Sequence, residues 1–549
     1  MNKKISLSKL TIIIIGLVFI NYLSGLFFFR LDLTNDKRYT LSNPALEILD
    51  EVTTPIDIKV FLTGDFPSDF KRLEIETLQI LEEIKSENGN IRFEFIDPLE
   101  ENTEQLIKMG LEPSQLSIQQ NGKTSEVIIF PWSIVANENK FEIVSLLKET
   151  NAQSQDEQLE SAVENLEYAF INAIHKINSS KSKKIAIIKG NEELDDLRIY
   201  DFLSTIGNYY HLAQFTLDSV EKTPQKTLNQ LTNYDLAIIA KPQQKFTEKE
   251  KYVLDQYFVN GGKTLWMVDQ VHAELDSLLR NGETVAIGRD LNITDLLFNY
   301  GVRVNIDLVT DLFAAKIPLA TGKVGNRTQY NEFLWKYYPL SFSKNNHPVN
   351  KNIDPVRFQF TNSIDLLEND IQKTVLLSSS QLSKTIGVPT SINLKSVSEK
   401  VDPKQFTDGN KPLAVLLEGN FKSAYKDRIK PIAISNHTDN SEENKMIVIS
   451  DGDIAANGIT KGQPDALGVN KWTGEIYGNK EFLLNTINYL LDDSGLIDIR
   501  SKTVDLKVLD KELAFKERSF YQAFNLIIPL IIILLFGLAF YLMQKRKYK

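Results

Sequence analysis

The chain has 549 residues and a formal net charge of −10 at pH 7, from 62 Lys and Arg against 72 Asp and Glu. This length leaves room for about two to four domains, and the acidic balance argues against a nucleic-acid-binding protein, which would carry a basic stripe. The absence of cysteine excludes disulfides, thiolate metal sites, iron–sulfur clusters and cysteine nucleophiles. Hydrophobic residues at 42% and charged residues at 24% indicate a globular chain and not a disordered one.

The first predicted element is a membrane span at residues 10–29, LTIIIIGLVFINYLSGLFFF, which follows a short tail at residues 1–9. A helix of about 20 residues rises about 30 Å, the thickness of a bilayer core. A cleaved signal peptide is the alternative, but its apolar stretch would be shorter and would end at small residues. We therefore expect an uncleaved anchor. Asn21, close to the middle of the span, is expected to bond to another membrane helix or to its own helix backbone.

A small α/β domain is predicted at residues 55–150, after a juxtamembrane segment at 30–54. The apolar patterns and turn signals predict, in order, a strand at 56–64, a helix at 68–88, a strand at 91–98, a short helix at 102–109 and strands at 115–120 and 126–130. The order β-α-β-α-β-β suggests a thioredoxin-like domain. Without cysteine, only the scaffold of that fold can be present.

A linker at residues 151–180 contains a predicted helix at 157–177, whose apolar residues repeat at spacings of three and four. This stripe packs either on its own domain or against a partner helix. From residue 181 to residue 495, short apolar strands alternate with helices, which predicts a parallel sheet covered on both faces. Residues at about 305–440 interrupt this alternation of strands and helices and are expected to form a large insertion.

The candidate ligand residues follow two of the apolar strands. Gly190, Asn191 and Glu192 come after one strand, and Asp451 and Asp453 come after another. Ligands often bind at the carboxyl ends of parallel strands, and two carboxylates spaced two apart can bind a cation or do acid–base work. The alternative is a solvated turn in which the aspartates cap the following backbone.

Nucleotide binding and nucleophilic catalysis find no support. Two Gly-Lys-Thr triplets, at 122–124 and 262–264, lack the preceding glycine of a P-loop, since Ser117 and Tyr257 stand in its place. No Gly-x-Ser-x-Gly elbow is present, and the five histidines show no ligand spacing. We therefore predict no catalytic residue, no resident metal and no cofactor.

A second membrane span is predicted at residues 524–543, FNLIIPLIIILLFGLAFYLM, after a juxtamembrane segment at 496–523. A buried core helix is the alternative. Lysines precede the first span, and the basic tail at 544–549 follows the second, so both termini are expected in the cytoplasm. The region between the spans is then expected outside the cytoplasmic membrane.

Several segments resemble the auxiliary subunits of gliding-motility ABC transporters of Bacteroidetes. They are RYTLSNPALEIL, PIDIKVFLTGDFPSDFKRLEIETLQIL, NHPVNKNIDPVRFQF at 346–360, SDGDIAAN, and GQPDALGVNKWTGEIYGNKEFLLNTINYLLDDSGLIDIRSK. The resemblance covers the whole chain. It implies a flavodoxin-like, amidotransferase-like domain at 181–495, and it implies partnership with a separate permease and a separate ATPase. Many relatives carry Gly-His-Gly-Glu where this chain has Gly190-Asn191-Glu192-Glu193, which weakens any chemistry inferred for that turn.

The predicted function is a non-enzymatic, substrate-binding-like or auxiliary subunit of an ABC transporter linked to gliding motility. It is expected in the inner membrane with a periplasmic domain, in contact with lipid, permease and ATPase, and not with nucleic acid. The alternatives are a purely structural scaffold of the envelope or motility machinery, and a membrane-tethered enzyme. An open, polar cavity at the carboxyl edge of the sheet would favour binding or catalysis, and an edge filled by the insertion would favour scaffolding.

Overall fold

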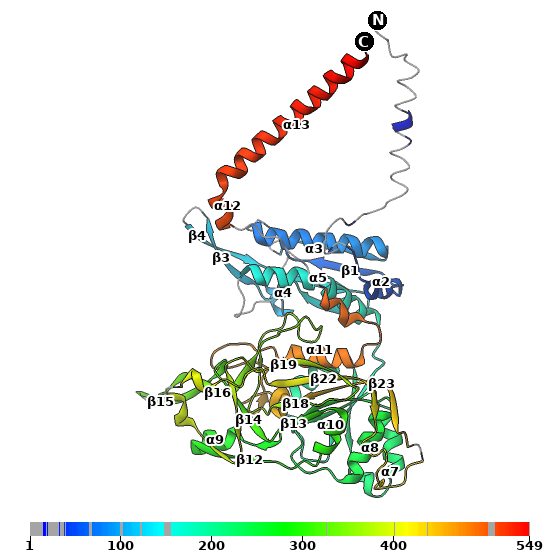
Figure 1. The fold of residues 1–549 in the computed structure, drawn as a ribbon, viewed down its shortest axis with the longest axis vertical. Helices are drawn as coiled ribbons and strands as arrows, with labels where there is room; N and C mark the ends of the chain where they lie inside the picture. The colour runs from blue at the N-terminus through cyan, green and yellow to red at the C-terminus, as the bar shows by residue number, and fades with distance from the viewer. Residues whose placement is uncertain are drawn as a thin grey trace. The chain divides into compact units, whose positions relative to one another are not determined.

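The computed structural model describes residues 15–17, 19, 32, 38, 40–64, 68–98, 103–120, 123–147, 155–325, 327–399, 401–435, 437–502 and 511–547. It is a mixed α/β structure with several sheets (Figure 1). The chain divides into two compact units, Met1–Thr503 and Val504–Lys549, and each is described by itself.

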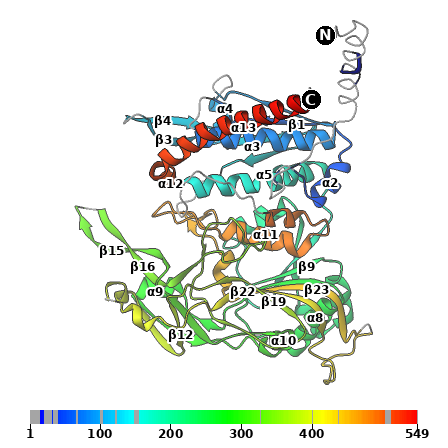
Figure 2. The same cartoon turned by 45° about the horizontal axis from the view of Figure 1, so that its top comes forward.

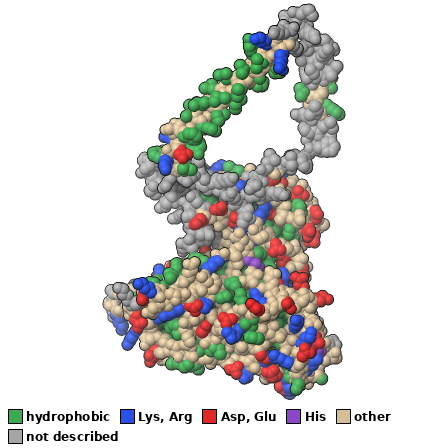
Figure 3. All heavy atoms as spheres, in the orientation of Figure 1, with side chains coloured by type: hydrophobic (Ala, Val, Ile, Leu, Met, Phe, Trp, Pro, Cys, Tyr) green, Lys and Arg blue, Asp and Glu red, His purple; other side chains and the backbone are tan. Residues whose placement is uncertain are grey.

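The second unit holds a long apolar helix. After the short helix α12 (Lys511–Lys516), α13 (Arg518–Lys547) runs through the predicted span at 524–543 with Pro529 inside it. Among the described residues it is the one helix long and apolar enough to cross a membrane, and none of its apolar stretch is buried. Hydrophobic side chains line its length in Figure 3. The predicted span at 10–29 lies outside the described residues apart from residues 15–17 and 19, which are helical.

The N-terminal domain is built on a four-stranded sheet of order β2-β1-β5-β6. β1 is parallel to β2 and antiparallel to β5, and β6 is antiparallel to β5. Alternate residues of β1 are buried, because one face of the sheet packs on the domain core. The elements are α2 (Asn43–Asp50), β1 (Ile56–Val60), α3 (Ser68–Glu87), β2 (Ile91–Phe95), α4 (Thr103–Lys108), β3 (Ser114–Gln120), β4 (Lys123–Ile129), β5 (Trp132–Ala136) and β6 (Phe141–Ser145).

The hairpin predicted at 115–130 forms at those residues, but it does not join the sheet of the domain. β3 and β4 pair as a separate two-stranded sheet. The third and fourth strands of the domain sheet are β5 and β6, which the sequence analysis did not predict. β5 begins directly after Pro131, so its apolar pattern continues that of the preceding strand. The boundary between the two strands is therefore not visible in the sequence.

Helix α5 (Gln155–Asn178) contains the predicted linker helix and packs within its own chain. Every residue of its apolar stripe is buried, which settles the alternative in favour of intramolecular packing: Leu159, Val163, Leu166, Phe170, Ala173 and Ile177. A buried carboxylate of α5, that of Glu167, fastens the two domains together. The Glu167 carboxylate accepts hydrogen bonds from Ser42 N at 2.7 Å and from Lys502 Nζ at 2.6 Å.

The larger domain is built on a seven-stranded sheet of order β19-β22-β23-β10-β9-β7-β8. The five strands from β23 to β8 are mutually parallel, and β22 and β19 are antiparallel additions. The strands are β7 (Lys184–Lys189), β8 (His211–Thr216), β9 (Leu236–Ala240), β10 (Lys263–Met267), β19 (Gln372–Ser378), β22 (Pro412–Lys422) and β23 (Asn440–Ile449). The segment at 305–440, expected as an insertion, therefore supplies β19 and β22 to this sheet.

Both faces of the large sheet are covered by helices, which explains its continuous apolar strands. Ala186 and Ile188 of β7 face a core shared with α7, α8 and α10. Ile185 and Ile187 face the opposite core, shared with α6 and α11, and Figure 2 shows α11 and α8 on opposite sides of the sheet. The helices are α6 (Tyr200–Gly207), α7 (Pro224–Leu231), α8 (Glu248–Val259), α9 (Leu275–Asn281), α10 (Thr294–Tyr300) and α11 (Asn479–Leu491).

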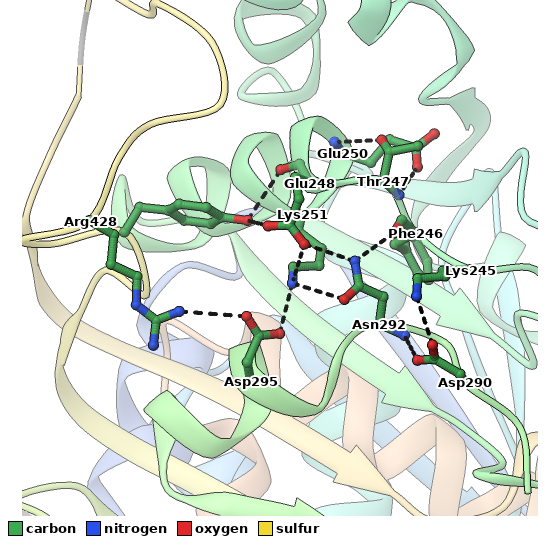
Figure 4. Close-up of polar contacts among 11 residues, drawn as sticks. Lys245, Phe246, Thr247, Glu248, Glu250, Lys251, Asp290, Asn292, Asp295 and Arg428 are labelled. Atoms are coloured by element: carbon green, nitrogen blue, oxygen red, sulfur yellow. Dashed lines mark hydrogen bonds and ion pairs between the residues drawn. The ribbon is translucent and has the colours of Figure 1, made fainter.

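Helix α8 begins at a side-chain cap, Thr247. Thr247 Oγ1 accepts from Glu250 N, and the Glu250 carboxylate accepts from Thr247 N at 2.7 Å, a capping box. One turn further, the buried ammonium of Lys251 lies 2.7 Å from Asp295 Oδ1 and 3.0 Å from Glu248 Oε1 (Figure 4). These contacts join the start of α8 to α10.

Smaller sheets surround the large one, and the longest hairpin, β15–β16, extends from its side in Figure 1. They comprise β11 (Val271–His272), β12 (Glu283–Gly288), β13 (Val302–Val304), β14 (Asp307–Asp311), β15 (Ala314–Val324), β16 (Arg327–Ser341), β17 (Val356–Arg357), β18 (Ile364–Leu366), β20 (Ser383–Gly387), β21 (Thr390–Asn393), β24 (Ile459–Thr460) and β25 (Gln463–Pro464).

Candidate functional site

The candidate residues lie at the carboxyl ends of the parallel strands of the large sheet. The turn 190–193 follows β7 and Lys241 follows β9, while Asp269 lies two residues after β10 and the turn 451–453 begins two residues after β23. Parallel strands bring these ends to one edge of the sheet. We call this the carboxyl edge.

The turn after β7 is fastened to the segment that follows β9. Gly190, at φ 126°, and Glu192, at φ 55°, have left-handed backbone conformations that shape the turn. The carbonyl of Asn191 accepts hydrogen bonds from Gln243 N and Gln244 N at 2.8 and 2.9 Å. The Gln244 amide donates to Glu192 Oε1 at 2.7 Å. These contacts hold the turn against the segment after β9, while the buried Asn191 Oδ1 and Glu193 Oε1 have no hydrogen-bond partner among the described residues.

The turn after β23 combines a cap with an ion pair. The fully buried Asp451 accepts from Asp453 N at 2.8 Å and so caps the short 3₁₀ helix Gly452–Ala455. Its other oxygen accepts from Gln359 N. Asp453 Oδ2 lies 2.7 Å from Lys241 Nζ and accepts from Gln359 Nε2 at 3.1 Å. The structure thus gives Asp451 the capping contact that was the alternative to a ligand role.

Lys241 is the centre of the charged cluster at this edge. Its side chain is 6% exposed, and its Nζ lies 4.0 Å from Asp269 Oδ2 and 3.6 Å from Glu274 Oε2 in addition to Asp453. Asp269 also accepts from Gly452 N at 2.6 Å. The two candidate turns do not bond to each other in the described contacts. They flank the segment 241–244 from its two sides.

Sequence reasoning missed Lys241, Asp269 and Gln359. Lys241 and Asp269 each follow directly on a predicted apolar strand, in AIIAKP and WMVDQ, so the position rule that selected Gly190 and Asp451 could have found them. Gln359 carries no such signal, because it reaches Asp451 from 92 residues away.

Burial controls the protonation of the cluster. Burial raises the pKa of Asp269 to about 6, although the Lys241 ammonium lowers it. Burial also raises the pKa of Asp451 well above its usual range, with the charges of Asp269 and Asp453 acting in the same direction. For Lys241, burial lowers the pKa, but the carboxylates of Asp453, Asp269 and Glu274 outweigh it and raise the pKa overall. Lys241 is therefore a permanent cation that compensates several buried carboxyl groups.

A segment of the inserted region closes this edge. Asn362 Oδ1 accepts from Gln270 N at 2.8 Å, Thr361 Oγ1 donates to the Ser450 carbonyl at 2.8 Å, and Gln359 bonds to Asp451 and Asp453. The described residues contain no group of three or more His, Cys, Asp or Glu side chains arranged to hold a metal ion. The carboxyl edge is chemically suited to lock the inserted region onto the sheet. The other candidate, Asn21, lies outside the described residues.

Comparison with known proteins gives a family match for both domains. Residues 182–486 match a family described as an ABC-type uncharacterized transport system. Residues 35–136 match a domain of unknown function, DUF7088. An uncharacterized protein of Borreliella burgdorferi is 22% identical over 557 residues, covering 98% of this chain and 97% of that protein.

Two solved structures align over more than half of this chain. The N-terminal domain of mmIFT52 is 15% identical with a TM-score of 0.33, covering 59% of this chain and 100% of that domain. A putative ThuA-like protein from Parabacteroides merdae is 12% identical with a TM-score of 0.27, covering 60% and 94%. With TM-scores this low, neither likeness bears on the fold or the function of this chain.

Proposed function

Because the chain belongs to the auxiliary family of ABC-type uncharacterized transport systems, we propose that it is a membrane-anchored, non-enzymatic subunit that works with a separate permease and a separate ATPase. The family match gives a transporter-associated auxiliary role, and it implies association with other transporter components. We further propose that this transporter is linked to gliding motility and that the chain belongs to the GldG group of Bacteroidetes, on the segment resemblances in the sequence.

The carboxyl edge of the large sheet is the observation that supports a non-enzymatic role. Gln359 and Asn362 cover the strand ends, and the Asp451, Asp453 and Lys241 side chains bond to one another or to the covering backbone. A catalytic group must reach the substrate. Groups that are already satisfied inside the protein fit a structural role better. Of the candidate ligand residues in the other turn, Asn191 and Glu192 are likewise bonded to the segment after β9.

We propose that the two sheets belong to two known scaffolds. In the N-terminal sheet, the order β2-β1-β5-β6 with β5 antiparallel to its neighbours supports a thioredoxin-like domain. In the large sheet, the five parallel strands follow the order 2-1-3-4-5 in chain numbering, which supports a flavodoxin-like domain with two added antiparallel strands.

We propose a two-span topology, with anchors at 10–29 and 524–543, both termini in the cytoplasm and the domains in the periplasm. The apolar helix α13 and the basic residues after it support the second anchor. Protease added outside spheroplasts is expected to digest the domains and to leave tags on both termini intact. Cleavage of either tag would contradict this topology.

Co-purification tests the proposed function. The tagged full chain, extracted from its own membranes in mild detergent, should bring down a permease and an ATPase identified by mass spectrometry. In Asn21→Leu, the yield of these partners should fall while the amount of inserted protein stays unchanged, because leucine inserts into a bilayer more readily than asparagine. An unchanged yield would place Asn21 outside the helix contact.

A purely structural scaffold is the second candidate, and the closed carboxyl edge favours it as well. The same co-purification separates the two. Recovery of envelope or motility components without any permease or ATPase would overturn the transporter proposal and leave the scaffold.

A further inference from the structure

A cavity of about 410 Å³ lies at the opposite end of the large sheet, where the strands begin. It is bounded by helix α5, by the connection 179–183 into β7, by residues 208–210 after α6, and by residues 488–497, which comprise the end of α11 and the segment after it. Lys140 and Glu142 of the N-terminal domain complete the wall. We call it the junction cavity, because it lies between the two domains. Its volume falls within the range of small-molecule sites, which favour such interfaces.

The connection 179–183 supplies hydrogen-bond donors along one wall. It reads Ser-Ser-Lys-Ser-Lys, and all five residues line the cavity. The Ser179 hydroxyl donates to the His175 carbonyl and Lys183 pairs with Asp493, so Ser180, Lys181 and Ser182 are the donors offered to a ligand. Hydroxyl and ammonium groups together satisfy the oxygens of an anionic group. Such a wall favours a ligand that carries a carboxylate or a similar anion.

Two ammonium groups at the junction cavity have no carboxylate partner among the described contacts. Lys140 Nζ donates to the Ser179 carbonyl at 2.9 Å, and Lys181 Nζ donates to the Gly207 carbonyl. A carbonyl oxygen satisfies the donor but does not neutralise its charge. An anion that enters the cavity would gain charge-assisted hydrogen bonds from both lysines.

The acidic residues of the cavity are already engaged. Asp492 accepts from Ser494 N and Ile497 N at 2.8 and 2.9 Å. Asp493 pairs with Lys183, and Glu142 lies 3.8 Å from Lys176. Burial lowers the pKa of His175, so its imidazole is neutral near pH 7 and adds no charge. Backbone N–H groups do not neutralise Asp492, so the four lysines of the wall exceed its three carboxylates by one positive charge.

Tyrosine rings form the apolar part of the wall. Tyr209 and Tyr210 meet edge to face, with ring centroids 6.5 Å apart, and the buried Tyr168 lines the cavity from α5. The Tyr210 hydroxyl is fixed by a hydrogen bond to Asn488 Oδ1 at 2.8 Å. Fixed rings of this kind can pack against the C–H face of a sugar ring, with amide and hydroxyl groups nearby for its hydroxyls.

We propose that the junction cavity binds a small acidic sugar, with its carboxylate at Lys140 and Lys181 and its ring against the tyrosines. The ligand would contact both domains at once, because Lys140 belongs to the N-terminal domain and Lys181 leads into the large sheet. This site uses no residue of the carboxyl edge, and its chemistry does not depend on the transporter assignment.

Calorimetric titration of the purified full chain in detergent micelles tests the proposal. D-glucuronate is the probe, D-glucose is the neutral control with the same ring, and acetate is the control with the charge but no ring. Saturable binding is expected for glucuronate, with glucose and acetate at least about tenfold weaker, a difference of about 1.4 kcal/mol each. No glucuronate binding, or equal binding of all three, would overturn the proposal.

Two variants locate the site. Lys181→Ala and Lys140→Ala should each weaken glucuronate about tenfold or more. Lys184→Ala removes an exposed lysine three residues from Lys181 that does not line the cavity, and it should leave the affinity unchanged. Equal weakening by Lys184→Ala would mean diffuse attraction by surface charge, and it would contradict a built site. The melting temperatures without ligand should match that of the parent chain, because the substituted lysines are exposed.

Discussion

The two ends of the seven-stranded sheet differ in what fills them. At the carboxyl edge, where open α/β sheets usually bind ligands, residues 359–363 cover the strand ends and bond to buried Asp451 and Ser450. At the amino end, the junction with the N-terminal domain leaves a cavity lined by exposed lysines. The difference teaches that sheet topology alone does not locate a ligand site. The segments packed on each edge decide which end stays open.

The two ends should also respond differently to substitution. The charges of the carboxyl edge are buried, so each depends on its partners, and removing one leaves the others uncompensated. The lysines of the junction cavity are exposed, and exposed charges contribute little to stability. Substitutions at the carboxyl edge should therefore change folding, and substitutions at the junction cavity should change binding alone.

The largest expected effect is that of Lys241→Met. The change keeps an unbranched side chain of similar length but leaves the carboxylates of Asp453, Glu274 and Asp269 without their cation. We expect a loss of about 3–5 kcal/mol in the free energy of unfolding, the range seen when one partner of a buried ion pair is removed. Denaturant unfolding of the full chain in detergent measures it.

The matched control is Lys245→Met, four residues further along. Lys245 lies 2.7 Å from Asp290, but the two side chains are 58% and 73% exposed. An exposed pair of this kind is worth about 0–1 kcal/mol. If both substitutions lowered the free energy of unfolding equally, the carboxyl groups of the carboxyl edge would not depend on a buried cation.

A smaller effect is expected on α5 at Glu167, a buried residue that does not line the junction cavity. In Glu167→Gln, the amide oxygen can still accept from Ser42 N, but the ion pair with Lys502 is lost. Hydrogen bonds to charged groups contribute about 1.5–3 kcal/mol, so we expect a loss of about 2 kcal/mol. Because Glu167 fixes α5 to the large domain, protease should also cleave the connection 179–183 faster.

Glu160→Gln is the control for this substitution, because it makes the same chemical change on α5 at a half-buried position one heptad earlier. It should leave both the stability and the cleavage rate nearly unchanged. If Glu160→Gln accelerated cleavage as much as Glu167→Gln, the effect would belong to the helix and not to the ion pair.

Local pattern predicted much of the large domain. The apolar strands before Gly190 and Asp451 are β7 and β23, and they lie in one parallel sheet as expected. The capping box that begins α8 is likewise local, since Thr247 and Glu250 are three positions apart. These features depend on residues within about four positions of one another along the chain, so they can be recognised from the sequence alone.

Features that depend on distant partners were not predicted. β19 and β22 join the sheet by antiparallel pairing, and nothing in their own composition separates them from strands of the surrounding small sheets. The closure of the carboxyl edge depends on Gln359, which meets Asp451 only after folding. Likewise, the junction cavity combines Lys140 with Lys181 across two domains.

The smallest expected effect is a pH dependence that belongs to Asp269. Its pKa is raised from 3.8 to about 6, first by burial, so the folded chain holds this proton more tightly than the unfolded chain does. The contribution of Asp269 to stability is therefore complete below pH 3.8 and is lost as pH rises through 6. From pH 5 to pH 6, the free energy of unfolding should fall by about 1 kcal/mol relative to Asp269→Asn, since a single group changes it by at most about 1.4 kcal/mol per pH unit.

The difference between the two proteins isolates this effect, because the other carboxyl groups are present in both. Removing the charge of Asp269 also lowers the pKa of Asp451, which acts in the same direction. Asp290→Asn removes a carboxylate whose pKa is lowered by its contact with Lys245, so it should not reproduce the trend. Parallel stability curves for the parent chain and Asp269→Asn between pH 4 and pH 7 would mean that water reaches Asp269. The carboxyl edge would then be as open as the junction cavity, and the contrast between the two ends of the sheet would fail.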